Sequence, residues 1–134
     1  MTMIIQFLTL SDVKMIHDSQ IHKHGGLYGL RDEKLLHSAI HYPQSFFNQQ
    51  YLHLDIHHMA AAYMYAIIKN HPFLDGNKRT GLLAALIFLK LNGIIIEEHD
   101  DKLFDLAMAA AQSHITEQEI ADFFKKKTIN SYFN

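Results

Sequence analysis

The sequence contains no cysteine and no excess of positive charge. Without cysteine, a disulfide framework and thiolate chemistry are excluded. The formal net charge is -2 over 134 residues, so the chain lacks the basic field that drives sequence-independent binding to nucleic acid. It also lacks a basic recognition helix, which disfavours a helical nucleic-acid regulator. We therefore do not expect nucleic acid as a partner.

No apolar run is long enough to span a bilayer. The longest, residues 81–96, is interrupted by Lys90 and by Asn92-Gly93. The apolar N-terminus, residues 1–10, has no cationic segment before it and no small-residue cleavage site after it. These features predict a soluble, cytoplasmic protein with no membrane partner. Its length fits a single domain, residues 1–134.

Helical periodicity with capping signals dominates the chain. Thr9 or Ser11 can cap a first helix, with Val13, Ile16, Gln20 and His24 on one face and Gly25-Gly26 as its end. Further helices are expected from Asp32, as a cap, to Pro43, from about 55 to 70, and from near Asn77 to Asn92. Another is expected from Asp100, as a cap, to about Ser113, and the last from the capping box Thr116–Glu119. The fold class is therefore all-α, a compact bundle of about six helices.

Two segments interrupt this periodicity. Residues 43–53 have no clean period and contain two adjacent phenylalanines, which predicts a loop or a short extended flap before the third helix, able to cover a site. Residues 94–98 read as a short extended connector. The helix after Asn77 has almost no polar face, which predicts a position at the centre of the bundle.

The stretch NHPFLDGNKRTG, residues 70–81, lies directly before that apolar helix. A helix that begins near Asn77 directs its free N–H groups and positive dipole end at the preceding loop, so this end is an anion site. Gly76 leaves room for a phosphate near the backbone, or serves the turn itself. Asn77, Lys78 and Arg79 add a neutral donor and two cations. The predicted anion is a phosphate chain.

Two further residues of the stretch add chemistry. Asp75 offers a hard oxygen ligand, and magnesium held by one carboxylate and substrate phosphates is common in nucleotide sites. His71 offers an imidazole, the side chain best suited near neutral pH to take a proton from an attacking hydroxyl. The residues therefore favour transfer of part of a magnesium-bound nucleotide to a hydroxyl.

The segment HPFLDGNKRTG resembles the signature of the Fic/Doc family, H-P-F-x-(D/E)-G-N-G-R-x-x-R, and HGGLYGLRDEKLLHSAIHYPQ resembles the N-terminal segment of its Doc branch, the toxins of death-on-curing toxin–antitoxin pairs. The resemblance covers nearly the whole chain. It implies that His71 is the catalytic base, that Asp75 holds magnesium, and that Gly76, Asn77 and Arg79 bind phosphates of ATP.

Two departures from the signature point within the family to the Doc branch. Lys78 replaces the second glycine and Leu82 replaces the final arginine. Glycine-type members generally transfer AMP. The lysine-type Doc toxin binds ATP in the opposite orientation and phosphorylates a threonine of translation elongation factor Tu. The resemblance thus favours a kinase that transfers phosphate from MgATP to a Ser/Thr hydroxyl and blocks translation. Lys78 is expected to contact phosphate, or to matter only by not being glycine. Because Pro72 and Gly76 fit ordinary Fic proteins, AMP transfer is the alternative.

Many Fic proteins inhibit themselves through an (S/T)-x-x-x-E-(G/N) segment whose glutamate pairs with the final arginine. The nearest segment here, Ser113–Gln118, fails at its last position and is explained as a helix start. By resemblance to Doc, a separate antitoxin with a disordered tail is the expected partner.

Other residues have simpler explanations. His53 and His57 are spaced to share a helix face, but no third ligand follows at a recognisable spacing, so surface or core histidines are favoured over a zinc site. Arg31 is a candidate for structural pairing, and Lys125–Lys127 fit a solvated helix end. A catalytically inactive module that only binds phosphate or nucleotide is the remaining rival.

Overall fold

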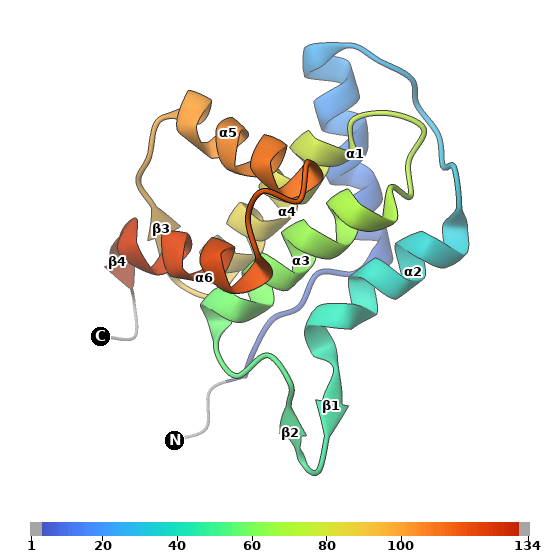
Figure 1. Ribbon diagram of the computed structural model, residues 1–134. Coiled ribbons are helices and arrows are strands. Elements are labelled where there is room, and N and C mark those ends of the chain that lie inside the picture. The colour runs from blue at the N-terminus through green and yellow to red at the C-terminus, as the bar shows by residue number, and fades with distance from the viewer. Residues whose placement is uncertain (1–3, 132–134) are drawn as a thin grey trace.

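The computed structural model describes residues 4–131 and consists of helices gathered around α3 (Figure 1). The helices are α1 (Leu10–His24), α2 (Glu33–His41), α3 (Ile56–Asn70), α4 (Asn77–Leu91), α5 (Asp100–Ala111) and α6 (Glu117–Lys126). A 3-10 turn (Tyr42–Gln44) follows α2, and the short strands are β1 (Phe46–Phe47), β2 (Gln50–Tyr51), β3 (Ile94–Ile96) and β4 (Thr128–Ser131). The predicted all-α bundle is confirmed. Within the described residues, no helix is long and apolar enough to cross a bilayer.

Side-chain caps start four of the helices where the sequence predicted them. The caps are Thr9, Asp32, Asp55 and Thr116. Thr9 and Thr116 each form a complete capping box, in which the cap and the third helical residue accept one another's backbone N–H. Asp100 is not a cap, because it is the first residue of α5 and follows His99. The strong caps explain why these helix starts were readable from sequence.

The core lies mainly between α3 and α4. Every residue from Met59 to Met64 on α3 is buried, with exposed fractions of 2% or less. A Cβ added to Gly81 on α4 would lie 3.0 Å from the backbone oxygen of Met64, so the two helices approach closely. The outer face of α4, including Leu83 and Ile87, is only partly buried. The prediction that α4 is the central helix was therefore wrong, since α3 holds that place (Figure 1).

The face of α1 also differs from the prediction. Val13 and Ile16 are buried as expected, but the buried face continues through His17 and Ile21. Gln20 and His24 instead line a cavity. The sequence suggested that the buried face continues through Gln20 and His24. It did not suggest His17, because the hydrogen bond that accompanies the burial of this polar residue is made to Asp75, far away in the sequence.

The two ends of the described chain are fixed against the bundle. The side chain of Asn92, just after α4, accepts from the backbone N–H of Gln6 at 2.9 Å and donates to its carbonyl at 3.0 Å. Strand β3 pairs antiparallel with β4, with Ile96 opposite Thr128. The extended connector at 94–96 is confirmed, but its partner β4 was not predicted, because a pairing between segments so far apart leaves no local signal.

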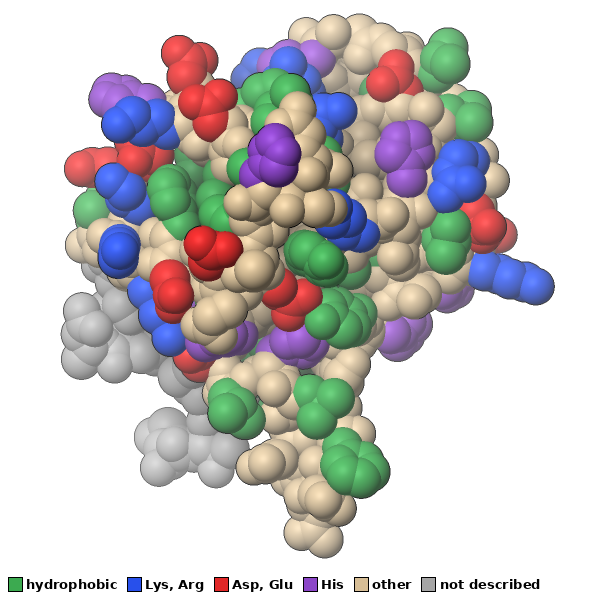
Figure 2. Space-filling view, in the orientation of Figure 1, with side chains coloured by type: hydrophobic (Ala, Val, Ile, Leu, Met, Phe, Trp, Pro, Cys, Tyr) green, Lys and Arg blue, Asp and Glu red, His purple; other side chains and the backbone are tan. Residues whose placement is uncertain are grey.

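The expected flap is a hairpin, yet it lies far from the sequence motif. β1 and β2 pair antiparallel just before α3 begins, whereas the motif follows the end of α3. A helix of 15 residues spans roughly 22 Å. Figures 1 and 2 show the hairpin projecting from the body, where Phe46, Phe47 and Leu52 are exposed. The hairpin therefore does not cover the motif loop.

Asp55 gives a test of the helix that carries the motif. Its carboxylate accepts from the backbone N–H of His58 at 2.9 Å and pairs with Lys125. Partial burial raises the pKa of this carboxyl, but hydrogen bonds from His58 and Lys125 outweigh it and hold the pKa at about 2, below the ordinary 3.8. We expect Asp55→Ala to lower the free energy of unfolding by about 1 kcal/mol at pH 7 in urea denaturation.

A lowered folded-state pKa means that this contribution is present above pH 3.8 and is lost as the pH falls towards 2. The difference in free energy of unfolding between the parent and Asp55→Ala should therefore become smaller as the pH falls over that range. Asp105→Ala, at an exposed position of α5, is the matched control and should change stability little at either pH. A difference that stays constant from pH 7 to pH 2 would contradict this account.

Candidate active site

The motif loop, residues 71–76, joins the end of α3 to the start of α4 through two left-handed residues. His71 ends α3 with φ 52° and ψ 55°, and its N–H donates to the Ile67 carbonyl at 3.2 Å. Gly76 precedes α4 with φ 75°. A Cβ at Gly76 would lie 3.0 Å from Cδ1 of Ile21, so both the turn and the approach of α1 favour glycine.

Asn77 locks this loop from inside. Its side chain is buried; Oδ1 accepts from the backbone N–H of Phe73 and Nδ2 donates to the Phe73 carbonyl, each at 3.0 Å. Both functional groups of the amide are therefore directed at the loop, and not at the cavity. Any phosphate contact by Asn77 in this geometry would use its backbone N–H.

The segment between α1 and α2 holds the outer side of the loop. The backbone N–H groups of Arg31 and Asp32 donate to the Pro72 carbonyl at 2.7 and 3.0 Å, and Leu74 N–H donates to the Gly29 carbonyl at 3.1 Å. An isolated bridge joins Leu30 and Phe73. Two segments forty or more residues apart in the sequence therefore form one continuous layer at the motif.

The Arg31 side chain fixes the residue on which base chemistry would depend. Its Nε donates to the His71 carbonyl at 2.6 Å and its Nη2 to the Asn70 carbonyl at 2.8 Å. These carbonyls are free ends of α3, so the guanidinium caps the helix. The predicted structural pairing of Arg31 is confirmed, and its partners are backbone groups.

His17 is a site-forming residue that the sequence did not reveal. It is buried on α1, its Nε2 donates to the Asp75 carbonyl at 2.8 Å, and its ring lies parallel to that of Phe73 with centroids 3.8 Å apart. This one side chain thus holds both ends of the Phe73–Asp75 stretch. The only sign of this role in the sequence was a polar residue beside the apolar positions Val13, Ile16 and Ile21 of α1.

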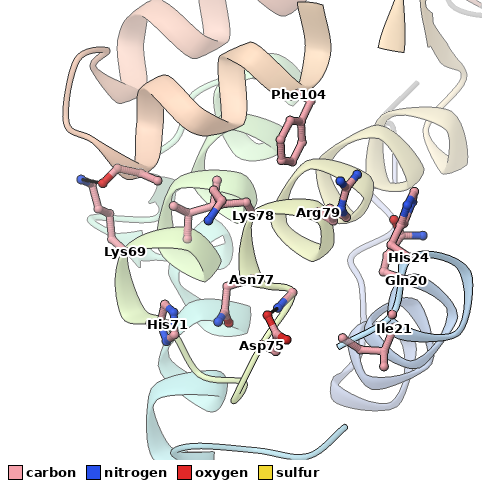
Figure 3. Close-up of a pocket in the computed structure, with 14 residues that line it drawn as sticks. Gln20, Ile21, His24, Lys69, His71, Asp75, Asn77, Lys78, Arg79 and Phe104 are labelled. Carbon is pink, nitrogen blue, oxygen red and sulfur yellow. Dashed lines mark hydrogen bonds between the residues drawn. The ribbon is translucent and has the colours of Figure 1, made fainter. Parts of the chain in front are cut away.

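These contacts surround a cavity of about 460 Å³ (Figure 3). His71 and Lys69 lie on the α3 side, and Gln20, Ile21 and His24 lie opposite them on α1. Between them lie residues of the motif loop and α4, with Phe104 of α5 above. The structure therefore brings all six sequence-predicted residues to one cavity: His71, Asp75, Gly76, Asn77, Lys78 and Arg79.

The first turn of α4 supplies donors to this cavity. Thr80 N–H donates to the Gly76 carbonyl at 3.0 Å, so the preceding N–H groups of Asn77, Lys78 and Arg79 have no partner within the helix. The positive end of the helix dipole lies at the same place. This geometry suits a phosphate group.

Positive charge in the cavity is not balanced by protein carboxylates. Across residues 4–131, neither Lys78 nor Arg79 forms a salt bridge. The guanidinium of Arg79 lies over the Phe104 ring, 4.4 Å from its centroid, which positions it without neutralising it. On the face seen in Figure 2, acidic and basic side chains otherwise intermingle. Lys78 and Arg79 therefore bring positive charge to the cavity without an ion-pair partner in the described chain.

Asp75 is the one carboxylate of the cavity. Its Oδ1 accepts from Gly76 N–H at 2.9 Å and its Oδ2 from Leu27 N–H at 3.2 Å. Each oxygen keeps a free lone pair, and the residue is exposed. The His71 side chain, also exposed, has no hydrogen-bond partner within residues 4–131. Both groups are therefore accessible to a ligand.

His53 and His57, which share a possible ligand spacing in the sequence, lie apart from the cavity in the described chain. His53 precedes α3 and so shares no helix face with His57. His53 lies 3.5 Å from Glu117, which also accepts a hydrogen bond from the Tyr42 hydroxyl at 2.9 Å. Among the described residues, no three His, Cys, Asp or Glu side chains come together as metal ligands.

Comparison with known proteins identifies the family. Residues 7–89 match the model described as the Fic/DOC family. The chain belongs to the Fic/DOC family. It is 32% identical over 111 residues to "Protein kinase doc" of Escherichia phage P1, covering 83% of this chain and 86% of that protein. It is 37% identical over 70 residues to "Toxin Doc" of Mycolicibacterium smegmatis, about half of each chain. The resemblance read from the motif is confirmed.

The lock by Asn77 predicts a stability cost in this Fic/DOC chain. Asn77→Ala leaves the buried N–H and carbonyl of Phe73 without partners, and we expect the free energy of unfolding to fall by about 2 kcal/mol. Asn77→Asp should also destabilise, because a carboxylate oxygen would face the Phe73 carbonyl. Chemical denaturation measures both, and a stability within about 0.5 kcal/mol of the parent for both variants would refute the lock.

His24 reports on the charge of the cavity. Its pKa lies below the ordinary 6.5 through desolvation and through the positive charges of Arg79 and Lys23. Removing a cation favours the protonated imidazole, so Arg79→Gln should raise the pKa of His24 in an NMR titration. Lys90→Gln, at the far end of α4, is the control and should leave it unchanged. An unshifted pKa in Arg79→Gln would show that Arg79 does not act on His24.

Proposed function

We propose that this Fic/DOC chain is a Doc-type toxin that transfers phosphate from MgATP to a Ser/Thr hydroxyl of a protein. The observation that carries the proposal is the meeting of an accessible imidazole, an accessible carboxylate and a helix N-terminus with unpaired cations in one cavity. Identity to "Protein kinase doc" over most of both chains supports the same chemistry. The resemblance of the motif to the lysine-type Doc branch makes translation elongation factor Tu the proposed target.

In the proposed reaction, the target hydroxyl oxygen attacks the γ-phosphorus, and the bond from that phosphorus to the β,γ-bridging oxygen breaks, which releases ADP. The hydroxyl proton passes to His71, whose backbone is fixed by Arg31. The N–H groups of the first turn of α4, together with Lys78 and Arg79, hold the phosphate oxygens and offset their charge. Orientation and charge stabilisation therefore supply most of the catalysis.

Magnesium fits the donor groups of the cavity. Because no cluster of three protein ligands occurs in the described part of the chain, a bound ion would rely on one carboxylate, phosphate oxygens and water, as is common for Mg²⁺ with nucleotides. Asp75, with a free lone pair on each oxygen, is the residue that would hold it. When bound, the ion would neutralise phosphate charge.

Two positions of α4 bear on whether the γ-phosphate or AMP is transferred. Lys78 is exposed and lines the cavity where a glycine would leave space. Leu82 lines a neighbouring cavity of about 240 Å³ together with Leu83 and Leu86, so its side chain adds no charge there. These features favour transfer of the γ-phosphate. AMP transfer, with pyrophosphate as the leaving group, is the second candidate, because Gly76 matches the signature of ordinary Fic proteins.

Restraint of the toxin by a separate antitoxin is part of the proposal. Glu117, the glutamate of the only candidate inhibitory segment, is bound to Tyr42 and lies beside His53. It is not among the residues lining the cavity. An inhibitory contact from this glutamate therefore finds no support, and a toxin without one needs restraint from another chain.

The test uses the purified chain with elongation factor Tu, Mg²⁺ and ATP labelled on either the α- or the γ-phosphate. We expect only the γ-label on the target. His71→Ala should lower the rate about 10²- to 10⁴-fold, since it removes the proton acceptor. Its melting temperature should stay close to that of the parent, because the side chain of His71 is exposed.

Each other result has a clear meaning. Transfer of the α-label would establish AMP transfer and refute the kinase. Retention of full activity by His71→Ala would refute its role as base. Binding of ATP without transfer to elongation factor Tu or to any protein of a cell extract would leave a binding module.

A further inference from the structure

Lys69 is a cation of the cavity that lies outside the sequence motif. It belongs to the last turn of α3, two residues before His71, and lines the same cavity as Lys78 and Arg79 (Figure 3). It forms no salt bridge within residues 4–131. Its Nζ donates to the Ser113 hydroxyl and, at 3.4 Å, to the Ala111 carbonyl. Neutral oxygens thus hold Lys69 in place and leave its charge unbalanced.

The partner of Lys69 is itself unusual. Ser113 has φ 59° in the turn after α5, where its N–H donates to the Ala110 carbonyl at 3.1 Å and His114 N–H to the Ala109 carbonyl at 2.8 Å. This is a Schellman turn, and glycine is the common residue at its left-handed position. Serine there is disfavoured by its Cβ. Sparsely populated backbone of this kind is often retained for function.

The hydroxyl that glycine would lack is the group that binds Lys69. Lysine near a helix end can also serve the helix dipole alone, and both α3 and α5 end here. That role does not require a strained serine, nor a position on the wall of a cavity that already holds two unpaired cations. A third cation opposite α4 adds repulsion when the cavity is empty, and a polyanion relieves it.

We propose that Lys69 binds the phosphate chain of the nucleotide from the α3 side and that Ser113 positions it for this contact. This inference deepens the proposed function and rests on it. The phosphate chain then lies between two walls: the first turn of α4 with Lys78 and Arg79, and the end of α3 with Lys69. His71 lies on the same wall as Lys69, so this contact holds the phosphates close to the base.

The experiment measures binding of inorganic triphosphate and of MgATP to the full chain by calorimetry. Lys69→Met keeps the aliphatic stem but removes the charge, and we expect both probes to bind at least tenfold more weakly. Lys69→Arg should recover most of the affinity. Lys90→Met, which removes an exposed cation at the far end of α4, should change neither.

Ser113→Gly separates positioning from folding. Glycine relieves the left-handed strain, so the melting temperature should equal or exceed that of the parent. Binding of triphosphate should nevertheless weaken about threefold, because Lys69 loses the partner that orients it. A purely structural serine would give the opposite pattern, a lower melting temperature with unchanged binding, and that result would overturn its positioning role.

The outcomes distinguish this inference from the proposed function. Equal affinity of parent and Lys69→Met overturns the inference and leaves the proposed function standing. Weaker binding by Lys69→Met in a chain that transfers no phosphate supports the inference and refutes the kinase. Failure of the parent chain to bind either probe refutes both.

Discussion

The two hydrogen bonds between the Asn77 side chain and the backbone of Phe73 are the constraint on which the rest of the site depends. They close the motif loop on itself and place the first turn of α4 directly beside the end of α3. The outer contacts, from Arg31, His17 and the backbone of the 29–32 segment, act on a loop whose shape is already set. Without the lock, those contacts would hold a loop with unsatisfied buried groups, which is costly.

This constraint brings together the two helix ends that flank the motif loop, the end of α3 and the start of α4. A loop of six residues leaves the C-terminal end of α3 and the N-terminal end of α4 side by side. Free carbonyls end one helix and free N–H groups begin the other. Arg31 satisfies the carbonyls of α3, whereas no protein group within the described chain satisfies the donors of α4 with an opposite charge. This asymmetry makes the junction a candidate anion site, with His71 at its edge.

Features of the fold and site that depend on neighbouring residues could be predicted from the sequence. Features that depend on contacts between distant residues could not. The capping residues, the helix start at Asn77 and the six motif residues depend on neighbours within a few positions, so their pattern is visible in the chain. The burial of His17, the partner of β3 and the cavity position of Lys69 depend on residues 30 to 60 positions away. The hairpin was expected as a possible flap, but its distance from the motif could not be read from the sequence, because that distance depends on the length and direction of α3.

Charge placement connects the family signature to the particular chemistry of this chain. The signature's final arginine would put a cation one turn further along α4, at the position where Leu82 here contributes an apolar side chain to a neighbouring cavity. Arg79 is shared with the signature, and the further cations lie at Lys78 and, across the cavity, at Lys69. Positive charge is thus moved from the body of α4 towards the junction that holds His71. In the proposed function, a phosphate chain would follow this charge, so the positions of the cations around an unchanged loop would decide which phosphorus lies nearest His71.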